Sequence, residues 1–97
     1  MNEDTFTPHG ELTIYKVKEF KHDIDEFISR NESFSIDFTD VSEFDTACLQ
    51  VMLYAKNITK KFGIEIKITK LSPIVWEAFD LYFLTDEFGI SESLVAS

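Results

Sequence analysis

The amino-acid sequence predicts an α/β domain in which a mixed β-sheet of about four strands has roughly three to four helices packed on it. Short segments with alternating apolar and polar residues, typical of half-buried strands, are separated by longer segments with apolar residues at helical spacing. Hydrophobic residues make up 44% of the sequence and include ten Phe, enough for one buried core. Because strands alternate with helices along the chain, helices layered on a sheet are expected.

The 97 residues are enough for one domain and too few for a second, so residues 1–97 are expected to fold as a single unit. Two segments lack strong periodicity, residues 1–9 and the polar segment 91–97. Both are expected to be weakly ordered, because chain ends without a buried face are held by few contacts.

The first half of the chain is expected to contain two strands and one helix. Residues 11–15 alternate apolar and polar side chains and follow a turn, which favours a strand. Apolar residues recur at helical spacing over residues 17–28, with charged residues on the other side. Residues 34–38 alternate again, and residues 39–45 are predicted to follow as a polar loop.

The second half is expected to contain two helices and one strand. A long, largely buried helix is predicted over residues 46–62, with Gly63 as its stop. Residues 64–68 give a clear alternating strand pattern, and Ser72 followed by Pro73 is typical of a helix start. The inner stripe of this last helix is predicted to be Val75, Ala78, Phe79, Tyr82 and Phe83.

Composition excludes several classes of function. Nine basic and eighteen acidic residues give a net charge of -9, which repels nucleic acid. Cys48 is the only cysteine, so no internal disulfide or cysteine zinc site is possible, and a reducing compartment is favoured. No apolar run approaches the roughly 20 residues that span a bilayer, and the acidic start lacks the charge of a signal peptide. We therefore expect a cytoplasmic location without membrane insertion.

The most informative segment is residues 37–49, where a strand is followed by a short loop and a helix start. Asp45 is predicted to cap the helix through its carboxylate. Thr46 then lies in the first turn, on the same polar stripe as Gln50 and Asn57, with an accessible hydroxyl. The plainer interpretation is that Asp45 and Thr46 simply start a helix, since both residue types are common there.

A phosphate on Thr46 would meet unpaired backbone N–H groups and the positive end of the helix dipole. The folded domain could therefore carry this phosphate without rearrangement. Asp40, Glu43 and Asp45 already make this surface acidic, and a further charge of about -1.5 to -2 is expected to repel a partner fitted to the unmodified form.

Residues 45–49, Asp-Thr-Ala-Cys-Leu, resemble the core pattern of the STAS family, in which Asp-Ser or Asp-Thr precedes a small residue, Gly and Leu. Thr46 stands where Ser is commoner in that pattern, and Cys48 stands where it has Gly. Similar matches lie at residues 10–12, 36–38, 61–64 and 81–84, so that the resemblance covers residues 10–88.

The resemblance implies a STAS fold and a bacterial signalling role like that of anti-sigma-factor antagonists. In such antagonists the hydroxyl residue after the Asp is phosphorylated by a partner that is both kinase and anti-sigma factor, and dephosphorylated by a phosphatase. Carried over, Thr46 is the candidate phosphoacceptor. The partner interface is predicted to be Thr39, Asp40, Ser42, Glu43, Asp45, Thr46, Ala47, Cys48 and Gln50.

An alternative stays open, because the sequence is also similar to chemotaxis-associated STAS proteins and to the small STAS subunit of lipid-asymmetry ABC transporters. In that case the domain is an adaptor, and Thr46 contacts a partner such as a transporter ATPase without being modified. No enzyme activity is expected, since no nucleophile with a base and no glycine-rich phosphate loop is present. Neither a cofactor nor a metal is expected, and the sequence assigns no oligomeric state.

Overall fold

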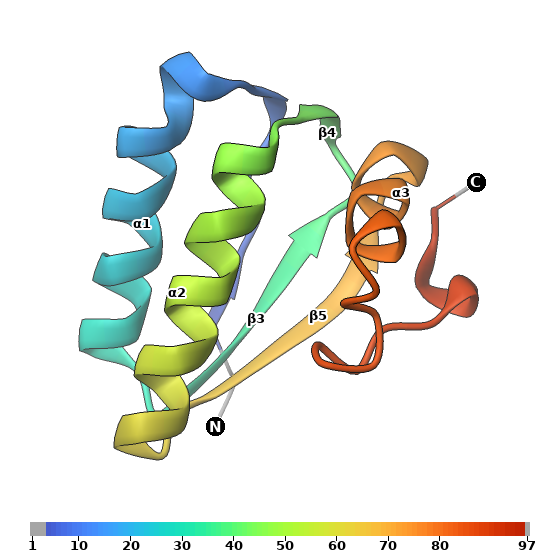
Figure 1. Cartoon of the computed structure of the whole chain (residues 1–97). Helices are drawn as coiled ribbons and strands as arrows, with labels where there is room; N and C mark the ends of the chain where they lie inside the picture. The colour runs from blue at the N-terminus through green and yellow to red at the C-terminus, as the bar shows by residue number, and fades with distance from the viewer. Residues whose placement is uncertain (1–3, 97) are drawn as a thin grey trace.

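The computed structural model describes residues 4–96, which form three α-helices, five strands and two 3-10 turns (Figure 1). The helices are α1 (Val17–Arg30), α2 (Thr46–Phe62) and α3 (Pro73–Leu81). The strands are β1 (Asp4–Phe6), β2 (Gly10–Leu12), β3 (Ser33–Phe38), β4 (Val41–Phe44) and β5 (Glu65–Leu71). The 3-10 turns are η1 (Ile14–Lys16) and η2 (Glu92–Leu94).

The strands form two small parallel sheets. One sheet has the order β1-β3-β5, and the other pairs β2 with β4. The predicted α/β class is confirmed, but the prediction of one mixed sheet of about four strands is wrong. The physical reason is that α1 lies between β1 and β3 in the chain and α2 lies between β3 and β5. A helical crossover returns the chain to the same end of the sheet, so the strands that it joins run parallel.

Helices α1 and α2 lie side by side over one face of the three-stranded sheet (Figure 1). The core lies between these layers, and its fully buried side chains include Ile24, Phe34, Ile36, Met52 and Ala55. The predicted bounds of α2 are confirmed at both ends. Gly63 ends the helix with φ 71°, a left-handed conformation that glycine adopts without a side-chain clash.

The segment between β3 and α2 is not a plain loop. Residues 41–44 form β4, which pairs with β2, whereas a polar loop was predicted over residues 39–45. Only Val41 is buried in this strand, so its apolar pattern is too short to indicate a strand. The predicted strand over residues 11–15 is shorter in the structure, because β2 ends at Leu12 and η1 follows.

Both described chain ends contact the sheet; the expectation of weak order at residues 1–9 and 91–97 stays a prediction, and residues 1–3 and 97 lie outside the described part of the chain. At the start, β1 pairs with β3, and the centroid of the Phe6 ring lies 5.1 Å from that of the Phe27 ring. At the end, the N–H of Ala96 donates a hydrogen bond to the carbonyl oxygen of Leu71 at 2.8 Å. These contacts join residues far apart in sequence, so local periodicity does not reveal them.

The last helix begins at Pro73 as predicted and ends at Leu81. Val75 and Phe79 are fully buried, as expected of the inner stripe. Tyr82 and Phe83 were placed on the same stripe, but they lie beyond the end of the helix and are exposed. That part of the prediction is wrong because the chain turns away before the stripe can continue.

A buried hydroxyl ties β4 to the start of α3. Ser72 occupies the N-cap position of α3, but its Oγ does not cap the helix and instead donates a hydrogen bond of 2.7 Å to the backbone carbonyl of Val41. We expect Ser72→Ala to lower the free energy of unfolding by about 1–3 kcal/mol, because it leaves a buried carbonyl without this donor. Ser29→Ala is the matched control, since Ser29 Oγ donates to a backbone carbonyl on an exposed helix surface. Urea unfolding of both variants checks the prediction, which fails if the two losses are equal.

Candidate functional site

The predicted interface follows one continuous segment from the end of β3 to the second turn of α2. Thr39 and Asp40 form the turn between β3 and β4, whereas Thr46 begins α2. The four residues of β4 lie between them and span about 13 Å of extended chain. The structure therefore separates Thr39 and Asp40 from Thr46 and does not bring the whole predicted interface to one point.

Solvent exposure divides the predicted interface further. The exposed members are Asp40, Ser42, Glu43, Thr46 and Gln50. The half-buried members are Thr39, Asp45 and Ala47. Cys48 is 0% exposed, so it cannot contact a partner and its assignment to the interface is wrong. The accessible part nearest to Thr46 therefore consists of side chains on β4 and on the outer face of α2.

Asp45 occupies the N-cap position of α2, but its carboxylate does not cap the helix. Its backbone carbonyl accepts hydrogen bonds from the N–H groups of Cys48 (2.9 Å) and Leu49 (3.2 Å). Its Oδ2 accepts a hydrogen bond of 3.1 Å from the N–H of Ile14, and its own N–H donates to the carbonyl oxygen of Leu12 (2.9 Å). The predicted capping role is wrong, because this carboxylate holds the start of α2 against the chain that leaves β2.

Thr46 is the first residue of α2, and its side chain is exposed as predicted. Gln50 and Asn57 are exposed too, which confirms the predicted polar stripe along this helix. Within the described part of the chain, the N-cap side chain makes no hydrogen bond to the first turn of α2. The first N–H groups of a helix lack intrahelical acceptors and form the positive end of its dipole. The Thr46 hydroxyl therefore lies where added negative charge is favoured.

Cys48 lies in the first turn of α2 and is buried in the core. Its Sγ lies 3.5 Å from the carbonyl oxygen of Leu12, to which the thiol donates. Burial, and secondly the neighbouring Asp45 carboxylate, raise the pKa of the Cys48 thiol to about 11. Reactive cysteines have lowered pKa values, so this thiol is protonated and unreactive at neutral pH.

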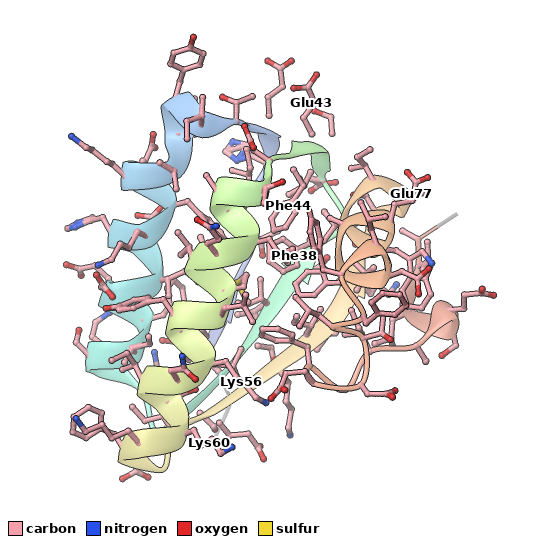
Figure 2. All side chains as sticks on the ribbon, viewed as in Figure 1. Phe38, Glu43, Phe44, Lys56, Lys60 and Glu77 are labelled. Atoms are coloured by element: carbon pink, nitrogen blue, oxygen red, sulfur yellow. The ribbon has the colours of Figure 1, made fainter. Side chains whose placement is uncertain are left out.

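A groove beside Thr46 was not predicted from the sequence. It lies between the start of α2 and α3, has a volume of about 330 Å³, and is lined by Phe44, Thr46, Leu49, Ile74, Glu77, Ala78, Leu81 and Tyr82. Figure 2 shows Glu77 on α3 and Phe44 beneath the start of α2. The sequence signal for this surface was residues 79–84, where only Asp80 is not apolar or aromatic. One helix face cannot bury that many consecutive side chains.

Residues 4–96 contain neither a candidate metal centre nor a helix that could span a membrane. No three or more His, Cys, Asp or Glu side chains there are placed to hold a metal ion together. The carboxylate of Asp37 accepts a hydrogen bond of 2.9 Å from the N–H of Thr39, and Asp45 is engaged by Ile14 as described above. Over the same residues, no helix combines the length and apolar character needed to cross a bilayer.

Comparison with known proteins gives one match to a protein family. A family model described as STAS domain matches residues 2–96. The match covers essentially the whole chain, including the segment from β3 to α2 that carries Asp45 and Thr46. No curated protein matches the sequence.

Proposed function

Because the chain belongs to the STAS domain family, we propose that it is a bacterial regulatory protein of the anti-sigma-factor-antagonist kind, in which phosphorylation of Thr46 switches partner binding. STAS domains generally act through protein–protein interactions. The observation that carries the proposal is the exposed Thr46 hydroxyl at the start of α2. In this role the protein is cytoplasmic and has no catalytic activity or cofactor of its own.

The start of α2 favours a phosphate on Thr46. The Asp45 carboxylate accepts a hydrogen bond from the N–H of Ile14 and makes none to the first turn. The N–H groups of Cys48 and Leu49 donate to the Asp45 carbonyl, so the N–H groups of Thr46 and Ala47 are the ones that face phosphate oxygens, and the helix dipole favours the added charge. Phosphorylation is expected to leave the fold intact and to change only the surface.

That surface change would be unfavourable for a partner fitted to unmodified Thr46. The phosphate adds about -1.5 to -2 charges at neutral pH. It lies in the groove that Glu77 also lines, and the exposed Glu43 of β4 precedes Thr46 by three residues. A partner whose apolar surface covers this groove must desolvate the phosphate, and this weakens binding. The proposed partners are a kinase-like anti-sigma factor for the unmodified form and a phosphatase for the modified form.

Intact-mass measurement with phosphosite mapping tests this function on protein purified from its own cells. We expect one added phosphate on the wild-type protein and none on Thr46→Ala. Thr69→Ala is the matched control, because Thr69 is also exposed but lies on β5. Phosphate that persists on Thr46→Ala, or is missing from wild type under several growth conditions, would contradict the switch.

A second function is favoured by the apolar groove, which offers a contact surface that needs no modification. Leu81 and Tyr82 line it and are 70% and 48% exposed. In this adaptor function the domain binds constitutively to a transporter ATPase or a chemotaxis-associated protein, and Thr46 is a contact residue. Stable co-purification with an ABC ATPase together with unphosphorylated Thr46 would favour the adaptor over the switch.

A further inference from the structure

Exposed apolar side chains lie at both ends of α3; we call this surface the α3 corner and define it as Ile74 in the first turn and Leu81, Tyr82 and Phe83 at and after the carboxyl end. The exposed fractions of these side chains are 39%, 70%, 48% and 90%, in that order. Ile74, Leu81 and Tyr82 also line the groove beside Thr46, so these three side chains and the candidate phosphoacceptor share one surface, and Phe83 follows Tyr82 in the chain. Contiguous exposed apolar side chains on a folded domain are typical of interaction sites.

Phe83 adopts a conformation that its own residue type disfavours. Its φ is 58°, the left-handed region that suits glycine, and it is the one residue other than glycine with positive φ in the described chain. Two backbone hydrogen bonds close this turn. The N–H of Phe83 donates to the carbonyl oxygen of Asp80 (3.0 Å), and the N–H of Leu84 donates to that of Phe79 (2.9 Å). Neither burial nor backbone preference explains phenylalanine here, and strained residues cluster at binding sites.

The segments that form the α3 corner and the adjoining groove are acidic. Residues 31–55 and 71–97, which supply β4, the first half of α2 and α3, contain ten Asp and Glu and neither Lys nor Arg. Figure 2 shows Glu43 and Glu77 at this end of the molecule, and Lys56 and Lys60 at the opposite end of α2. Any partner of this face therefore gains from positive charge at its rim.

We propose that the α3 corner and the adjoining groove bind an amphipathic helix of the protein partner, with apolar residues on one face and Lys or Arg on its flanks. This inference rests on the proposed function for the existence of a partner and specifies the chemistry of its docking segment. A second copy of this chain does not fit, because a two-fold contact would bring the acidic rim against itself. An anionic membrane surface is repelled for the same reason.

The shared groove also gives the proposed switch a physical basis. A helix seated on Leu81 and Tyr82 covers the groove that Thr46 lines. The apolar face of the helix would cover Thr46, whereas its Lys and Arg lie at the rim, so a phosphate on Thr46 would lose water without gaining a buried partner, and burying an unpaired charge is costly. Docking of the helix and modification of Thr46 are therefore expected to oppose each other.

The test is an amide NMR titration with two designed peptides of about 18 residues, or five helical turns. Both carry Leu on one helical face, and the other positions are Lys and Arg in the first peptide and Glu in the second. We expect the basic peptide to shift amide signals within residues 44–50 and 74–84 and to bind at least about tenfold more tightly than the acidic one. Equal binding of the two peptides, or no binding of either, would overturn the inference.

Two substitutions at Phe83 separate its contact role from its strain. Phe83→Ala removes the ring and keeps a strained residue, whereas Phe83→Gly removes both ring and strain. Both are expected to weaken binding of the basic peptide by about tenfold. Only Phe83→Gly is expected to raise the melting temperature, by roughly 2–6 °C. Phe62→Ala is the control, because Phe62 is exposed at the far end of α2. Unchanged peptide binding by Phe83→Ala would overturn the inference.

Thr46→Glu distinguishes failure of this inference from failure of the proposed function. If the basic peptide binds Thr46→Glu as tightly as wild type, the docking surface stands and the switch at this face fails. If neither peptide binds although Thr46 is phosphorylated in cells, the docking inference fails and the proposed function stands. Weakened binding of the basic peptide to Thr46→Glu supports both.

Discussion

Replacing Phe38 with alanine is expected to lower the free energy of unfolding by about 3–5 kcal/mol. Phe38 is 0% exposed, at the end of β3. Its ring centroid lies 6.3 Å from that of Phe20 on α1, 5.5 Å from that of Phe44 on β4 and 6.5 Å from that of Phe79 on α3. Figure 2 shows Phe38 and Phe44 close together beneath the start of α2. One substitution therefore opens a cavity where four elements meet.

A loss of that size approaches the whole stability of a small domain, which is about 5–15 kcal/mol. Chemical unfolding followed by circular dichroism measures it, with Phe62→Ala as the control. Phe62 is 66% exposed, and its removal is expected to change the free energy of unfolding by no more than about 0.5 kcal/mol. A loss below about 2 kcal/mol for Phe38→Ala would mean that the neighbouring rings close the cavity by repacking.

The elements that could be predicted from sequence are those whose signals are local. The bounds of α2 follow from the apolar run after Thr46 and from Gly63, which ends the helix in a left-handed conformation. The start of α3 follows from Pro73, whose missing N–H suits the first helical position. The alternation in β3 spans enough residues to show period two, and that strand is confirmed.

The elements that could not be predicted depend on pairing across the chain. Both β1 and β4 are very short, and each is ordered by a partner strand far away in sequence. Val95 is ordered by a bridge to Leu71 on β5, which no alternation near the C-terminus indicates. The expectation of one mixed sheet failed for two reasons: each helical crossover makes the strands that it joins parallel, and the short strands β2 and β4 pair in a separate sheet.

In the candidate site, too, the features with local sequence signals could be predicted, and those that depend on contacts between distant segments could not. The exposure of Thr46 follows from helical periodicity, which is local. The direction of the Asp45 carboxylate does not, because its hydrogen-bond donor is the N–H of Ile14 on a different element. The groove and the α3 corner depend on where α3 ends, and a single turn at Phe83 moves two aromatic side chains from the predicted inner stripe into solvent.

The Cys48 thiol is expected to make the folded protein lose stability at alkaline pH. Burial, with a smaller contribution from the Asp45 carboxylate, raises its pKa from an ordinary value of 9.0 to about 11. Below about pH 8, the thiol is protonated in the folded and the unfolded chain, so the full stability is present. Between these pKa values, the unfolded chain loses the proton while the folded chain keeps it. The unfolded state is thereby favoured as the pH rises.

The expected loss is about 2 kcal/mol between about pH 8 and pH 11, since each pH unit between the two pKa values contributes about 1.4 kcal/mol. Urea unfolding under reducing conditions measures it for wild type and for Cys48→Ala. Lys and Tyr titration affects both proteins, so the difference between their free energies of unfolding isolates the thiol. This difference should shift against wild type by about 2 kcal/mol over that range. A constant difference would contradict the prediction, because it would mean that Cys48 ionises as readily in the folded protein as in the unfolded chain. Complete burial of the thiol and the nearby Asp45 carboxylate both oppose ionisation in the folded protein.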